Sequence, residues 1–235
     1  MQGAVRIGKT RQYPPQPMAA RFARDFAYMP RAPLPVPDFC RENRLALEGL
    51  WPVAGIDEVG RGCLAGPVAA AAVILDPADL PEGLNDSKRL RAAVREELYE
   101  EIIGRALSVS VAFMSAADID RINIRQASLA AMRRALAALA VVPRYVLIDG
   151  NDLPRDLSCP AETIVKGDAS SASIAAASIV AKVARDRLMA RLCRNYPAYG
   201  FSRHVGYGTK EHLTALAKHG PSPYHRLSFS PLHKT

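Results

Sequence analysis

Gly55-Ile56-Asp57-Glu58-Val59-Gly60-Arg61-Gly62-Cys63-Leu64-Ala65 is the stretch that says most about the fold and function of this chain. An apolar run delivers two adjacent carboxylates, and a Gly-Arg-Gly turn follows at once. Acids at a strand end can bind a divalent cation, and glycines beside an arginine let backbone N–H groups approach a phosphate or sugar. Neighbouring side chains on a strand point to opposite faces, so both acids reach one site only if the strand bends near Gly60. The stretch indicates a metal site beside a nucleic-acid contact.

Length and composition indicate a water-soluble protein of one large domain. The chain has 235 residues, of which 49% are hydrophobic. Its apolar runs fall short of the roughly 18 residues that span a bilayer, so we expect no membrane association. The four cysteines are scattered, which favours free thiols in the cytoplasm over disulfides or a zinc site. We expect a monomer, since no predicted element looks like an unpaired apolar interface.

The net charge of +8 is distributed unevenly along the chain. Residues 1–50 hold eight Lys/Arg against four acids, and residues 187–235 hold eight against one. Residues 51–186 hold fifteen against eighteen and are slightly acidic. An acidic centre between basic flanks fits a metal-binding core with arms for a polyanion.

The apolar pattern predicts an α/β fold, with a mixed sheet and helices on both faces. The predicted strands cover residues 53–58, 68–75, 107–113, 145–149 and 162–166, and the first two should pair antiparallel. The predicted helices cover residues 38–50, 91–105, 124–140, 170–193 and 211–219, with a short additional helix capped by Ser115.

We divide the chain into three parts. Residues 1–45 form a basic, Pro-rich tail that we predict to be disordered, because seven of the eighteen prolines lie within residues 1–37. An organellar transit peptide is the less favoured alternative there, since the prolines would break an amphipathic helix. Residues 46–193 form the catalytic domain, and residues 194–235 form a basic extension that completes the substrate-binding face.

Two further acids, Asp149 and Asp168, follow predicted strands. Carboxylates at the ends of buried strands are costly unless they are paired or bind metal, and hard oxygen ligands favour Mg²⁺ or Mn²⁺ over zinc. Each acid alone also fits a structural role: Asp149 could be a turn residue, and Asp168 could cap a helix. Together with Asp57 and Glu58 they favour phosphodiester hydrolysis assisted by two metal ions.

These residues resemble the ribonuclease HII family, the type 2 ribonucleases H. Its most characteristic motif is residues 55–62, and matches follow the family order from about residue 53 to residue 231. Further matching motifs are Asp86-Ser87-Lys88, Asn123-Ile124, Asp149-Gly150, Lys166-Gly167-Asp168-Ala169, Ala181-Lys182, Gly206-Tyr207-Gly208-Thr209 and His225-Arg226. The resemblance implies a ribonuclease H-like five-stranded mixed sheet with a C-terminal helical extension.

The resemblance also implies an activity. The enzyme would degrade RNA in RNA–DNA hybrids and incise 5′ to a ribonucleotide embedded in duplex DNA, leaving 3′-hydroxyl and 5′-phosphate ends. Such an enzyme would serve ribonucleotide excision in DNA replication and repair.

The resemblance assigns roles to ten residues. Catalytic ligands of Mg²⁺ or Mn²⁺ would be Asp57, Glu58, Asp149 and Asp168. Substrate contacts would be Gly60, Arg61 and Gly62 at the ribose 2′-hydroxyl, Tyr207 at the neighbouring deoxyribose, and Lys88 and Lys182 at phosphates. We expect Arg185 and Asp186 to form a structural ion pair, and His225 and Arg226 to anchor the C-terminal segment.

Two alternatives remain open at this point. The first is another nuclease on the same fold, such as a type 1 ribonuclease H or an integrase-like enzyme, which would not need a Gly-Arg-Gly loop directly after its acids. The second is a non-catalytic nucleic-acid-binding protein, which would not need all four acids.

Overall fold

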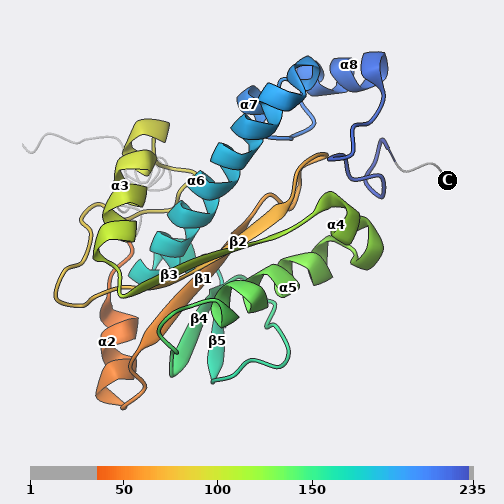
Figure 1. The fold of residues 1–235 in the computed structure, drawn as a ribbon. Helices are drawn as coiled ribbons and strands as arrows, with labels where there is room; N and C mark the ends of the chain where they lie inside the picture. Colours follow the sequence, from red (N-terminus) through yellow and green to blue (C-terminus); the bar gives the residue numbers. More distant parts are fainter. Residues whose placement is uncertain (1–35, 233–235) are drawn as a thin grey trace, which may run out of the picture. The chain divides into compact units, whose positions relative to one another are not determined.

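A central antiparallel strand pair organises the sheet, as the sequence predicts. The computed structural model describes residues 36–232. Its strands are β1 (Val53–Val59), β2 (Val68–Ile74), β3 (Ser108–Met114), β4 (Tyr145–Asp149) and β5 (Ala161–Ile164). They form one sheet in the order β3-β2-β1-β4-β5, in which β1 pairs antiparallel with β2 and parallel with β4 (Figure 1). The predicted mixed five-stranded sheet is confirmed.

Alternating side chains of β1 face two different helices. Ala54 and Ile56 belong to the core that the sheet forms with α5 (Ile124–Ala137). On the opposite face, α6 (Ala172–Asn195) packs directly on the strand backbone, because a Cβ added at Gly55 would lie 2.1 Å from the carbonyl carbon of Ser173. Glycine at this position therefore sets how closely α6 approaches β1.

Two further helices complete the layers. α3 (Ala92–Arg105) packs with α6 through the core on that face of the sheet, and Leu98 and Ile102 are its buried residues. α4 (Ala116–Ile122) begins at a capping box, in which the Ser115 hydroxyl accepts a hydrogen bond from the Asp118 N–H at 3.1 Å. The predicted cap is confirmed.

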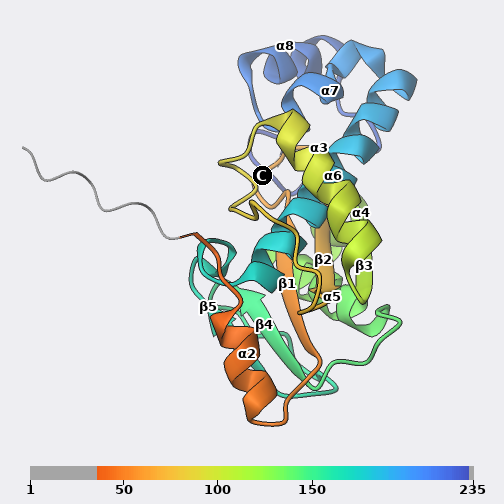
Figure 2. The same ribbon diagram turned by 90° about the vertical axis from the view of Figure 1, so that its left-hand side faces the viewer.

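The C-terminal extension continues from the far end of α6, beyond the sheet (Figures 1 and 2). It contains η3 (Pro197–Tyr199), α7 (Phe201–His204) and α8 (Lys210–His219), of which α7 is not predicted from the sequence. Its centre is a buried aromatic and histidine cluster, where the Nε2 atoms of His212 and His225 lie 3.0 Å apart and Phe201 packs against both rings. Phe201 also belongs to a small hydrophobic core with Ala65 and Met189, which joins the extension to the end of α6 and to the segment after β1.

The boundary predicted at residue 45 is wrong. α2 (Cys40–Leu47) crosses it. Glu42 is fully buried, and its carboxylate accepts hydrogen bonds from the Ser171 hydroxyl at 2.7 Å and the Ser173 N–H at 3.0 Å. These contacts hold α2 against the start of α6, so residues 36–45 belong to the catalytic fold. The remainder of the predicted tail lies outside the described residues.

Within residues 36–232, no helix is both long enough and apolar enough to cross a membrane.

Candidate active site

Three of the four predicted acids meet where β1 and β4 lie side by side. Ile56 of β1 pairs with Ile148 of β4, so Asp57 and Asp149 follow at neighbouring positions. Asp168 comes from the short 3₁₀ helix η2 (Gly167–Ala169) that leads into α6. One carboxylate oxygen from each residue lies within 4.8 Å of the other two. We call Asp57, Asp149 and Asp168 the acid triad.

Backbone groups fix the orientation of two of these carboxylates. Oδ1 of Asp149 accepts a hydrogen bond from the Gly167 N–H at 2.7 Å. A Cβ at Gly167 would lie 2.6 Å from Cδ1 of Ile174 and 3.4 Å from that oxygen, so a larger residue here would force the Ile174 side chain to shift. Oδ1 of Asp57 accepts from the Glu58 N–H at 2.7 Å. Backbone N–H groups therefore orient two members of the triad.

The acid triad carries more negative charge than its surroundings offset. Burial, followed by the charges of Glu58 and Asp149, raises the pKa of Asp57 well above its ordinary value. Burial and Asp149 also raise the pKa of Asp168. Lys88 is the nearby cation, with Nζ 3.7 Å from Oδ2 of Asp168. One lysine against three carboxylates leaves a site that a divalent cation with oxygen ligands would fit.

Glu58 lies apart from the triad. Both β1 acids are within the strand, so their side chains point to opposite faces, and Glu58 turns toward the α5 side. Its Oε1 lies 3.1 Å from Nη1 of Arg61. Burial raises the pKa of Glu58, and Arg61 opposes that rise. Glu58 and Asp149 line one small hollow, so Asp149 adjoins both Glu58 and the triad.

The Gly-Arg-Gly loop, residues 60–62, follows the acids directly and is held from behind by a buried arginine. Arg226 is fully buried and donates hydrogen bonds to the carbonyl oxygens of Gly60 at 2.6 Å, Arg61 at 2.7 Å and Gly66 at 3.0 Å. Burial lowers the pKa of Arg226 to about 10, so its guanidinium stays charged at neutral pH. Among residues 36–232, the N–H groups of Arg61 and Gly62 have no acceptor. The loop thus turns carbonyls inward and leaves donors free.

A second buried arginine supports the same loop. Arg185 donates to the carbonyl oxygens of Ala65, Pro67 and Val205, and the Cβ of any other residue at position 60 would lie 2.2 Å from its Nε. Gly60 also has φ +92°, a left-handed conformation that favours glycine. The expected Arg185–Asp186 ion pair is wrong, because Arg185 is buried among backbone carbonyls, whereas Asp186 pairs with Lys182.

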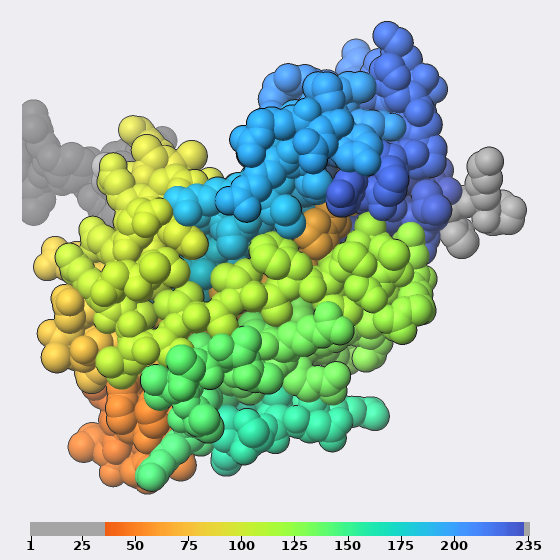
Figure 3. All heavy atoms as spheres, viewed as in Figure 1, coloured from red at the N-terminus to blue at the C-terminus, as the bar shows by residue number. Residues whose placement is uncertain are grey.

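The remaining predicted substrate-binding residues differ in how close they lie to this loop. Tyr207 is 44% exposed, and its Cε1 atom lies 3.9 Å from the Cβ position of Gly62. Lys182, by contrast, pairs with Asp186 at 2.8 Å on α6. Atoms of the β1–β2 region, in orange, lie exposed between the green α4 segment and the blue C-terminal extension in Figure 3. The structure brings Tyr207 to the loop and leaves Lys182 engaged on its own helix.

The role of Arg226 at the Gly-Arg-Gly loop is not predictable from the sequence. The predicted anchoring of the C-terminal segment is confirmed, since the Arg226 N–H donates to the Leu64 carbonyl and His225 pairs with Ala65. Its grip on residues 60–62 has no signal in a single sequence, because the contact joins positions 166 residues apart.

Comparisons with known proteins agree with this geometry. A family model described as Ribonuclease HII matches residues 54–232. Ribonuclease HII of Rhizobium etli (strain CIAT 652) is 60% identical over 204 residues, which cover 87% of this chain and 88% of the relative. The structure of ribonuclease H2 from Pyrococcus horikoshii OT3 superposes with a TM-score of 0.66 at 25% identity, covering 77% of this chain and 94% of that chain. The structure of a PCNA:RNase HII complex from Archaeoglobus fulgidus gives 0.65 at 29% identity, covering 78% and 97%. The chain therefore belongs to the ribonuclease HII family, and it is a metal-dependent endoribonuclease.

Proposed function

We propose that this enzyme cleaves RNA in RNA–DNA hybrids and incises duplex DNA on the 5′ side of an embedded ribonucleotide, leaving 3′-hydroxyl and 5′-phosphate ends. The observation that carries the proposal is that Asp57, a member of the acid triad, lies three residues before Gly60, the first residue of the Gly-Arg-Gly loop. This proximity of a hydrolytic site and a donor-rich loop suits a reaction in which one nucleotide is both recognised and cut.

The carboxylates would hold the cofactor. Asp57, Asp149 and Asp168 offer oxygen ligands, and Glu58 offers another on the far side of Asp149. Two bound Mg²⁺ or Mn²⁺ ions would supply an activated water and offset charge on the leaving oxygen. The raised pKa of Asp57 supports this assignment, because burial and the nearby charges of Glu58 and Asp149 favour uptake of a proton or a cation.

The loop would read the sugar. A ribose 2′-hydroxyl can both donate and accept hydrogen bonds, and it is the group that distinguishes RNA from DNA at one nucleotide. The free N–H groups of Arg61 and Gly62 can donate to it without an intervening side chain. Arg226 and Arg185 keep the loop rigid, so little ordering entropy would be lost on binding.

Neighbouring side chains would position the duplex. Tyr207 offers a half-exposed ring beside Gly62 for the adjoining deoxyribose. Lys88, beside Asp168, would contact the scissile phosphate, and Lys182 would contact a phosphate only after releasing Asp186. The four cysteines are free thiols, which supports a reducing compartment such as the cytoplasm, where the enzyme would serve replication and repair.

The family assignment favours this enzyme over both alternatives. A type 1 or integrase-like nuclease shares the acids but does not account for the loop that Arg226 and Arg185 stabilise. A non-catalytic binding protein does not account for the buried triad.

Product mapping tests the proposal. Purified protein is incubated with Mg²⁺ or Mn²⁺ and three end-labelled duplexes of one sequence: all DNA, DNA with one ribonucleotide, and a long RNA–DNA hybrid. We expect a single cut 5′ to the ribonucleotide, cutting throughout the hybrid, and none in DNA. Cleavage restricted to the long hybrid would refute the embedded-ribonucleotide activity.

A further inference from the structure

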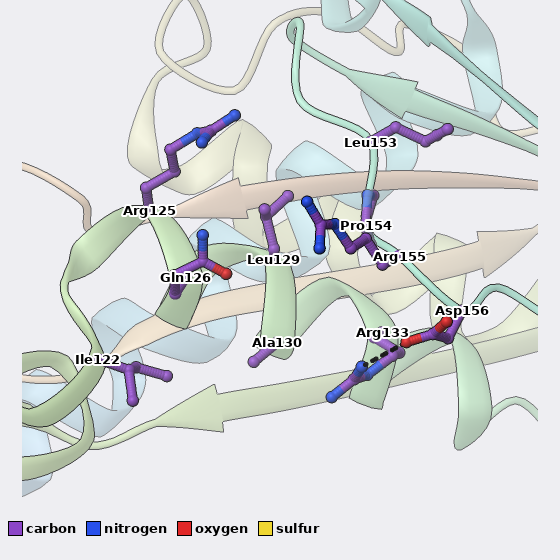
Figure 4. Close-up of a pocket in the computed structure, with 10 residues that line it drawn as sticks. All are labelled: Ile122, Arg125, Gln126, Leu129, Ala130, Arg133, Leu153, Pro154, Arg155 and Asp156. Carbon is purple, nitrogen blue, oxygen red and sulfur yellow. Dashed lines mark ion pairs between the residues drawn. The ribbon is translucent and has the colours of Figure 1, made fainter.

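A cavity formed by residues within the described range lies beside the active site. It is a groove of about 500 Å³ between α5 and the loop that connects β4 to β5. Leu129 and Pro154 line it together with Arg125, Arg133 and Arg155 (Figure 4). We call it the α5 groove. Nothing in the proposed catalytic steps uses it.

The groove continues into the active site. Arg125 and Leu129 line both the α5 groove and the small hollow that contains Glu58, Arg61 and Asp149. A polymeric ligand that runs from the acids past Arg61 would therefore reach the α5 groove next.

Positive charge is spaced regularly along this path. Arg125, Leu129 and Arg133 occupy positions i, i+4 and i+8 of α5, so they share one face of the helix. Eight residues at 1.5 Å rise separate the two arginines by about 12 Å. Arg155 extends from the opposite wall toward α5 (Figure 4). α5 itself contains no acidic residue, because its sequence is IRQASLAAMRRALA.

The arginines keep donors free for a ligand. Asp152 accepts from Nε and Nη2 of Arg125 at 3.0 and 2.6 Å, which leaves Nη1 available. Asp156 lies 3.9 Å from Arg133, and both side chains are more than half exposed, so this pair is weak. Arg155 forms no ion pair with any of residues 36–232. The groove offers three guanidinium groups against two carboxylates.

We propose that the α5 groove binds the sugar-phosphate backbone of the substrate beyond the cleavage site. This inference rests on the proposed function. Arginine forks suit phosphate oxygens, and the apolar walls at Leu129 and Pro154 suit the less polar faces of the sugars. The groove would add affinity without reading sequence, because phosphate contacts position a duplex and do not specify it.

Matched variants of neighbouring arginines test the groove. Arg133→Gln alters the groove, whereas Arg134→Gln removes the same charge from an exposed α5 residue that does not line it. Arg133→Gln/Arg155→Gln is the stronger perturbation. Dissociation constants are measured by fluorescence anisotropy in EDTA at several salt concentrations, on a duplex with one ribonucleotide and flanks of about ten base pairs, roughly 34 Å each. Two further duplexes each lack one flank.

The double variant should bind the duplex with both flanks at least about tenfold more weakly than the wild type does. The slope of log Kd against log salt concentration should be smaller by about 1.8, as expected for two lost phosphate contacts. Arg134→Gln should leave the slope unchanged, and removing the flank that reaches the groove should abolish the difference between the double variant and the wild type. The proposal would be overturned if Arg133→Gln and Arg134→Gln changed the dissociation constant equally, or if the double variant lost the same affinity for all three duplexes. Since binding in EDTA needs no cleavage, failure of the proposed activity would be seen separately, in the product mapping.

Discussion

Replacing Arg226 tests whether the Gly-Arg-Gly loop must be held from behind. Arg226→Gln removes a guanidinium that donates to the carbonyl oxygens of Gly60, Arg61 and Gly66. A buried polar group left without its partner costs about 1–3 kcal/mol. Glutamine is shorter and can serve at most one of the three carbonyls, so two lost bonds predict a loss of about 2–6 kcal/mol in the free energy of unfolding.

The loss of these hydrogen bonds should weaken recognition of the ribonucleotide as well as protein stability. Two of the three carbonyls belong to residues 60–62, so the N–H groups that face the sugar lose their fixed direction. We expect kcat/KM on a duplex with one ribonucleotide to fall at least about tenfold, equivalent to 1.4 kcal/mol. The dissociation constant for an all-DNA duplex of the same length should stay within about twofold, because phosphate contacts are elsewhere.

Urea denaturation and steady-state kinetics on the same preparations supply both quantities. Tyr199→Phe is the control, since it removes one hydrogen bond to the Gly220 carbonyl within the C-terminal extension and does not contact the loop. It should lower stability by about 1 kcal/mol and leave kcat/KM unchanged. Arg226→Gln protein that is destabilised yet keeps wild-type kcat/KM would refute the reasoning and reduce Arg226 to a structural anchor.

Three further predictions concern the loop, the histidine cluster and the triad. Gly60→Ala should lower the free energy of unfolding by about 1–3 kcal/mol or more, because Gly60 has a positive φ and contacts Arg185. Gly62→Ala should change the free energy of unfolding by less than about 0.5 kcal/mol and still lower kcat/KM. Equal denaturation midpoints for the two variants would contradict this prediction. Burial and the neighbouring His212 lower the pKa of His225 from 6.5 to about 4. The stability that neutral His225 contributes is therefore present above pH 6.5 and is lost as the pH falls toward 4. His225→Gln should flatten the curve of unfolding free energy against pH between pH 6.5 and 4. Burial raises the pKa of Asp57, so its charged form costs stability at neutral pH. In EDTA, Asp57→Asn should therefore raise the Tm at pH 7, and this gain should vanish at acid pH. The same variant should abolish the Tm increase that Mg²⁺ or Mn²⁺ gives the wild type.

Local patterns account for most of the fold. The antiparallel pairing of the first two strands and the Ser115 cap are each set by neighbours in sequence, and both appear as predicted. The acids Asp57 and Asp149 could be placed together because parallel strands end at one edge of a sheet.

Long-range contacts account for what the sequence could not supply. Glu58 faces away from the triad because β1 stays regular through Val59 and does not bend, a feature that depends on pairing with β2. Arg185 and Arg226 sit in the interior among backbone carbonyls, although charged residues read as surface residues in a sequence. The predicted boundary at residue 45 divides α2, because no local pattern shows that Glu42 is buried against Ser171.

Asp149→Asn gives the most direct test of the central claim that the acid triad cuts beside a separate ribose-reading loop. Asparagine keeps the Oδ1 that accepts from the Gly167 N–H, so the local fold should survive the loss of charge. Single-turnover cleavage of a duplex with one ribonucleotide should slow by several orders of magnitude, while the variant still binds that duplex more tightly than the all-DNA duplex. A rate within about tenfold of wild type, or a loss of the preference for ribose together with the loss of cleavage, would contradict the account.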